Sequence, residues 1–165
     1  NGKRWEGAVH AISSMLDSQL RHNLHSYATL IEIKRNSGKW QEALSVWNAI
    51  QQHHKGGERL SQCLAKCLDA LSTANQTQRA LDIFESEKPK DYVQLNVYAA
   101  ALRACASTGQ WERALSIRTE ANWRFRKEAN KYYNVRHAST AEMVESYLTT
   151  LVVAGRWKHA LNVLG

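Results

Sequence analysis

The chain has 165 residues with a single proline, and 44% of its residues are hydrophobic and 22% charged. This composition excludes a disordered or collagen-like chain and favours one folded, mostly helical domain. The 22 lysines and arginines outnumber the 15 acidic residues, and the formal charge of +7 favours an acidic partner such as nucleic acid or an anionic surface. The sequence has no apolar run of about 18 residues, so we expect no transmembrane helix and no membrane partner.

Apolar residues recur at three- and four-residue spacing along most of the chain, which predicts amphipathic helices. In the clearest stretch, Tyr27, Leu30 and Ile31 share one helical face, and Gly38 ends that helix shortly before another begins. Two helices joined in this way form a helical hairpin. In chain order, we expect helices at residues 3–16, 23–37, 40–53, 58–73, 76–88, 94–108, 111–133, 139–154 and 157–164.

A short motif recurs at the turn inside each hairpin. The pattern Gly-x-Trp-x-x-Ala-Leu stands at residues 38–44, 109–115 and 155–161, with weaker copies at 5–9 and 77–81. One hairpin cannot bury both of its faces, so neighbouring hairpins must stack. The predicted fold is all-α, a right-handed α-solenoid of helix-turn-helix units spanning 1–165. Its repeats are roughly 1–20, 23–57, 58–93, 94–138 and 139–165, and because the first and last are incomplete we expect a fragment of a longer array, or ends that a partner covers.

Tryptophan is the largest residue of the motif, and its fixed place beside the repeat alanine predicts a core position. This interpretation applies to the turn tryptophans Trp5, Trp40, Trp111 and Trp157. The pattern leaves open whether Trp47 and Trp123 are buried or exposed.

Two of the expected first helices contain similar segments, Ser-Tyr-Ala-Thr-Leu-Ile at 26–31 and Val-Tyr-Ala-Ala-Ala-Leu at 97–102, each followed by the motif turn. These segments resemble pentatricopeptide repeats. Tetratricopeptide repeats have a similar length, but they place a small residue twelve positions before the repeat alanine, where this chain has Ile31, Leu68, Leu102 and Leu148. The frequent turn tryptophan resembles divergent pentatricopeptide proteins of protist mitochondria. The resemblance implies a mitochondrial location and work on organellar RNA, in transcript processing, editing or the mitochondrial ribosome.

In that family, the residue after the motif tyrosine usually forms a hydrogen bond with an RNA base. Ala28, Ala65, Ala99 and Glu145 occupy this place, and neither a methyl group nor a carboxylate suits that role. The other residues predicted to line the inner face balance acids with bases. They are His25, Glu32, Arg35, Gln62, Asp69, Asn96, Arg103, Glu142 and Glu145. We therefore expect no sequence-specific RNA binding in the groove.

Positive charge concentrates between residues 118 and 137, where the distance between successive repeat alanines lengthens to 46 residues. Cations interleaved with aromatic residues suit contact with RNA phosphates and unpaired bases. A long amphipathic helix with core aromatics and a solvated basic face fits the same residues, and the sequence leaves both readings open. The candidate RNA-binding residues are Arg118, Arg124, Arg126, Lys127, Lys131, Tyr132, Tyr133 and Arg136.

The sequence gives little support for catalysis or metal binding. The three cysteines include Cys63 and Cys67 one helical turn apart in an apolar segment, which predicts free thiols in a reducing compartment. With His53 and His54 nearby they could suggest zinc, but structural zinc sites use shorter cysteine spacings. The sequence contains no nucleophile elbow, phosphate-binding glycine loop or HExxH helix. We expect no catalytic residue, no metal site and no cofactor.

The leading hypothesis is a non-enzymatic, RNA-associated scaffold. It would be a structural pentatricopeptide-like subunit of an organellar ribonucleoprotein such as a mitochondrial ribosome. It would contact rRNA or other organellar RNA without sequence readout, and neighbouring proteins through its grooves and ends. Two alternatives stay open, namely a transcript-specific factor for RNA editing, processing or stability, and a purely protein-binding adaptor like tetratricopeptide proteins.

Overall fold

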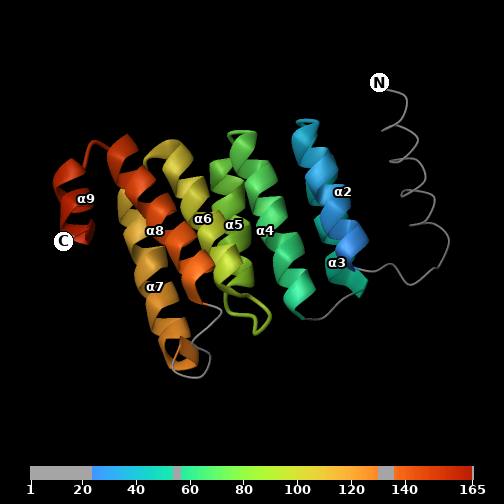
Figure 1. Cartoon of the computed structure of the whole chain (residues 1–165). Helices are drawn as coiled ribbons and strands as arrows, with labels where there is room; N and C mark the ends of the chain where they lie inside the picture. The colour runs from blue at the N-terminus through green and yellow to red at the C-terminus, as the bar shows by residue number, and fades with distance from the viewer. Residues whose placement is uncertain (1–23, 54–56, 130–135, 165) are drawn as a thin grey trace.

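The computed structural model describes residues 24–53, 57–129 and 136–164, and all regular structure in these ranges is helical. The helices lie side by side in one row (Figure 1). The first helices of the hairpins are α2 (Leu24–Asn36), α4 (Glu58–Thr73), α6 (Leu95–Thr108) and α8 (Arg136–Val153). The second helices are α3 (Trp40–His53), α5 (Thr77–Glu87), α7 (Trp111–Ala129) and α9 (Trp157–Leu164).

The all-α prediction is confirmed for these residues, and the helix bounds agree closely with those expected from periodicity. The largest difference is at the start of α8, which begins at Arg136 and not at residue 139. The expected continuation of α7 to residue 133 and the expected helix at 3–16 fall outside the described residues.

The first helices form the more continuous of two layers. α4 packs against α2, α6 against α4, and α8 against α6, while each first helix also packs on the second helix of its own hairpin. Within the described ranges, the second helices contact one another far less than the first helices do. The buried core therefore lies between the layers, around large side chains such as Trp47, Phe84 and Tyr98.

The same turn closes all four described hairpins. The residue five positions before the repeat alanine has a positive φ in each copy: Gly38 at 69°, Asn75 at 56°, Gly109 at 66° and Gly155 at 68°. At every turn the N–H of the following residue donates to the carbonyl five residues earlier, as from Lys39 to Lys34 at 2.9 Å. This bond satisfies a carbonyl at the end of the first helix. Asparagine fills the position in the second copy because it tolerates the left-handed region better than other side chains do.

The turn tryptophans connect neighbouring hairpins, which the prediction of a pure core position missed. Trp40 and Trp111 are half-buried against the core. The guanidinium of Arg79 lies 5.0 Å from the ring centroid of Trp40, and that of Arg156 lies 4.9 Å from the ring centroid of Trp111. These cation–π contacts tie each motif to the next hairpin. Trp5 and the side chain of Trp157 are outside the described part of the structure.

We expect Gly38→Ala to lower the free energy of unfolding by about 1 kcal/mol, because an alanine at a left-handed φ is strained. A Cβ atom at Gly38 meets nothing within 4 Å, so the loss measures backbone conformation and not a clash. The measurement is urea denaturation followed by circular dichroism. Gly38→Asn is the matched control and should lose less; equal stability of all three proteins would contradict the role of this turn.

Candidate nucleic-acid interface

The positions that would read RNA bases lie between helices. The exposed fractions of Ala28, Ala65 and Ala99 are 6%, 7% and 0%. The equivalent residue of α8, Glu145, is exposed, and α8 is the last first helix in the described row. The side of each first helix that carries this residue therefore faces the next first helix. Alanine there permits the two backbones to lie close together. These alanines allow neighbouring first helices to pack closely.

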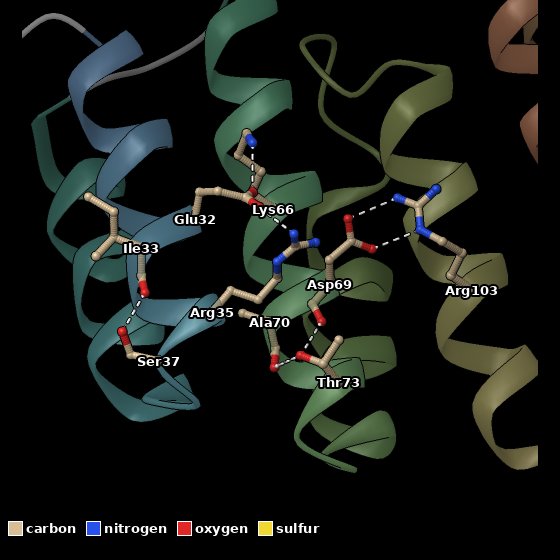
Figure 2. A network of polar contacts seen from close by, with 9 residues as sticks. All are labelled: Glu32, Ile33, Arg35, Ser37, Lys66, Asp69, Ala70, Thr73 and Arg103. Carbon is tan, nitrogen blue, oxygen red and sulfur yellow. Dashed lines mark hydrogen bonds and ion pairs between the residues drawn. The ribbon is translucent and has the colours of Figure 1, made fainter. Parts of the chain in front are cut away.

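Charged residues on the face that the sequence predicts to be the inner one pair across neighbouring helices (Figure 2). The Lys66 ammonium donates to the Glu32 carboxylate at 2.8 Å, which joins α4 to α2. The Arg103 guanidinium donates two hydrogen bonds of 2.9 Å to Asp69, which joins α6 to α4. Arg35 also forms an ion pair with Glu32 within α2. Acids balance bases at this face as expected, and the pairs that cross between helices connect one repeat to the next.

Polar residues extend the same row of contacts. The Ser61 hydroxyl donates to the Asn96 amide oxygen at 2.7 Å, again between α4 and α6. His25 and Gln62, also predicted to line the face, are exposed. The side chain of Glu142 lies outside the described residues. Where the inner face is described, its charges alternate in sign and do not form the continuous positive track that RNA phosphates require.

Arg124, a predicted RNA contact, anchors the loop that follows α5. Its Nη2 donates to the carbonyl of Lys90 at 2.8 Å, and its Nη1 donates to the carbonyl of Lys88 and to the Tyr98 hydroxyl. The guanidinium supplies a donor to the Lys88 carbonyl, which lies past the end of α5, and a second donor to the Lys90 carbonyl, which also accepts from the N–H of Val93 at 3.2 Å. The geometry of Arg124 thus favours a structural role.

The other described candidate, Arg118, also contacts protein. Its guanidinium lies 4.8 Å from the ring centroid of Tyr147, so it connects α7 to α8. Arg126 and Lys127 belong to the last turn of α7, but their side chains are outside the described part. The same is true of the side chain of Arg136 at the start of α8. Lys131, Tyr132 and Tyr133 lie wholly outside the described residues.

The aromatic residues near the end of α7 divide between core and solvent. Phe125 packs edge-to-face on Tyr98, with centroids 5.5 Å apart, and Tyr98 packs likewise on Phe84 at 5.1 Å. Trp123, only two residues before Phe125, is 80% exposed. The amphipathic-helix interpretation fits Phe125, and RNA contact by this segment stays a prediction. Phe125 belongs to the amphipathic core, and Trp123 is a large aromatic surface presented to solvent.

The cysteines are poor candidates for chemistry. Burial raises the pKa of Cys63 to about 11 and that of Cys67 to about 12, so both thiols stay protonated at neutral pH. The Cys63 thiol also donates to the carbonyl of Leu24 at 3.4 Å. Across the described ranges, no group of three or more His, Cys, Asp or Glu side chains is placed to hold a metal ion.

Sequence reasoning missed three exposed apolar residues at the α8 end of the row. Val152, Val153 and Leu161 have exposed fractions of 65%, 58% and 59%. At the position of Val152, the other first helices carry Arg35, Ser72 and Ala106. This change from polar or small residues to valine is the sequence signal that could have identified Val152 as an unusual exposed residue.

Comparisons with known proteins add no family assignment. No protein-family model matches the sequence, and a search of the curated proteins finds no significant match. None of the described helices has both the length and the apolar character needed to cross a membrane.

We expect Arg124→Ala to lower the free energy of unfolding by about 2 kcal/mol, because the carbonyls of Lys88 and Lys90 lose a charged donor. Arg124→Lys keeps the charge but not the paired donors, so its stability should be intermediate. Chemical denaturation gives both values. An Arg124→Ala protein with full stability and weaker RNA affinity would instead make Arg124 a binding residue.

The pair of Glu32 and Lys66 predicts an acid-sensitive contribution to stability. The hydrogen bond from Lys66, aided by the positive charges of Lys66 and Arg35, holds the pKa of Glu32 below its usual value against the opposing effect of burial. A carboxyl with a lowered pKa in the folded state stabilises the protein above its unfolded-state pKa. That contribution disappears as pH falls through the folded-state pKa.

A double-mutant cycle with Glu32→Gln and Lys66→Gln measures this contribution. We expect a favourable coupling energy in urea denaturation at neutral pH and its loss under acidic conditions that protonate Glu32. A coupling energy near zero at neutral pH would show that the ion pair does not connect α2 to α4 energetically, and a favourable value that stays constant with pH would show that the coupling does not depend on the charge of Glu32.

Proposed function

We propose that this chain is a non-enzymatic scaffold that binds RNA without reading its sequence. The observation that carries the proposal is the contrast between two surfaces. The base-reading positions of α2, α4 and α6 are buried alanines, and the charges beside them pair within the protein. The end of α7 instead combines an exposed tryptophan with the adjacent basic residues Arg126 and Lys127.

The proposal includes a right-handed α-solenoid. The repetition of one turn geometry in four hairpins supports it, as does the use of the same face by each first helix to receive the next. Closely packed first helices and more loosely packed second helices would curve such a row, with the first helices on the inside. The inner face would then be the one joined by ion pairs.

The charge distribution supports RNA contact at the α7 end. Four basic residues stand between positions 126 and 136, against Glu128 alone. Neutralising phosphates releases counterions, and this provides affinity for RNA that does not depend on sequence. The cations of Arg118 and Arg124 position the helix that carries this segment, because they contact Tyr147 and the loop after α5.

The resemblance to pentatricopeptide repeats supports a place in an organellar ribonucleoprotein. On that basis we propose a mitochondrial protein that contacts rRNA or other organellar RNA, for example as a structural subunit of the mitochondrial ribosome. Neighbouring proteins would cover exposed apolar residues at the α8 end, where Val152 and Val153 lie.

Those valines also favour a second candidate, a protein-binding adaptor. A helix is a suitable occupant because α8 exposes, through Glu145, Thr149 and Val152, the stripe that other first helices use to receive a neighbour. In this case the basic residues of α7 would only keep the protein soluble.

RNA binding measured by fluorescence anisotropy separates the candidates. We expect equal affinity for two unrelated single-stranded RNAs of the same length and a steep fall in affinity with salt. Arg126→Ala with Lys127→Ala should flatten the plot of log affinity against log salt by about 0.7 for each phosphate that the variant no longer neutralises. The control Arg59→Ala with Lys158→Ala removes the same charge from exposed positions of other helices and should keep the wild-type slope.

Three other outcomes of these binding measurements would each favour a different conclusion. Failure of the wild-type protein to bind either RNA would leave the adaptor as the better candidate. A strong preference for one RNA at physiological salt would favour a transcript-specific factor. Equal effects of the two double variants would mean that net charge alone, and not the end of α7, determines affinity.

A further inference from the structure

Trp123 is an unusual tryptophan for this protein. Trp47 is buried, Trp40 and Trp111 are half-buried against the core, and yet Trp123 is 80% exposed. Neighbouring residues, and not Trp123, provide the contacts that pack α7 against the rest of the protein. Exposing so large an apolar side chain to water is unfavourable, which directs attention to what it could bind.

The neighbours of Trp123 show which way its face of α7 points. Arg124 reaches the loop after α5, Phe125 packs on Tyr98 of α6, and Ala121 is buried. Earlier in the helix, Arg118 reaches Tyr147 of α8. Trp123 therefore stands on the side of α7 that faces away from α5, α6 and α8.

Helical spacing places polar and basic positions on the same side. Ser116 and Thr119 come seven and four residues before Trp123, and both are exposed. Arg126 and Lys127 follow by three and four residues, one turn further along α7. The result is a single indole in a polar stripe, next to two basic positions at the end of the helix.

We propose that Trp123 is a stacking platform for an unpaired RNA base, with the phosphates of the same strand along the basic end of α7. This inference rests on the proposed function and deepens it, because it names single-stranded RNA as the ligand class. An indole ring stacks on any base, since every base has a π face, and so needs no base-reading residue. Bases within a duplex already stack on one another and are not available to it.

A hydrophobic protein partner fits this surface less well. Docking of a protein usually needs a continuous apolar patch with several buried anchors. The exposed residues beside Trp123 that are described, Asn122, Thr119 and Ser116, are polar, and the exposed Leu115 of α7 stands eight residues before it. The exposed valines Val152 and Val153 belong to α8. Because Arg118 contacts Tyr147 of α8, that helix lies on the side of α7 opposite to Trp123.

The test compares the wild-type protein with Trp123→Ala and Trp123→Phe on single-stranded and duplex RNA of equal length, over one series of salt concentrations. We expect Trp123→Ala to weaken binding of the single strand about tenfold, and Trp123→Phe to retain most of the affinity, because a smaller ring still stacks. Duplex affinity and the salt slope should not change, because both depend on phosphate contacts. Unfolding midpoints of all three proteins should coincide, since Trp123 is not in the core.

A second readout uses the protein without substitution. Stacking of a base on the exposed indole should quench tryptophan fluorescence when single-stranded RNA is added, and Trp123→Ala should remove that quenching. The inference is overturned if wild-type protein binds RNA but Trp123→Ala binds single strands equally well, or loses single-strand and duplex affinity alike. If the wild-type protein binds no RNA, the proposed function itself fails. Trp123 would then be tested as a contact for a protein partner.

Discussion

The close approach of successive first helices is the constraint on which the rest of this structure depends. α6 shows it most clearly, because Ala99, Ala100, Ala101 and Ala104 are fully buried between its neighbours. Without bulky side chains in the way, polar groups of adjacent helices come within hydrogen-bonding distance. The pairs Glu32–Lys66 and Asp69–Arg103 follow from that spacing. Substituting large residues into this layer would separate the helices and the ion pairs together.

This constraint also explains why RNA contact is proposed far from the inner face. A residue such as Ala65 cannot both hold two helices close and present a hydrogen-bonding group to a base. Several basic residues likewise contact other parts of the protein. Arg79 lies over Trp40, Arg118 over Tyr147, and Arg124 holds the carbonyl of Lys90. Net charge therefore overstates the number of cations that a nucleic acid could contact.

Local patterns in the sequence were sufficient to predict the helices and their turns, because three- and four-residue periodicity and the Gly-x-Trp motif depend on neighbouring residues alone. The partners of Arg124 could not be predicted, since Lys88 and Lys90 are more than thirty residues away and use backbone carbonyls that carry no sequence signal. Periodicity could have separated Phe125 from Trp123, because Phe125 continues the series Ala114, Ile117 and Ala121 on the buried face of α7. What covers that face, Tyr98 of α6, could not be predicted from local spacing.

The inner-face ion pairs have a consequence for how such a chain can change in length. The two acceptors, Glu32 and Asp69, are 37 positions apart, which is the step from the repeat alanine Ala43 to Ala80, so they occupy equivalent places in successive units. Deleting the whole unit of α4 and α5 would therefore bring Arg103 opposite Glu32, an equivalent acceptor. Inserting a single residue into α4 would rotate every later position of that helix by about 100° and take either its acceptor or its donor out of reach. The array is modular in whole repeats, and its first helices are intolerant of smaller insertions.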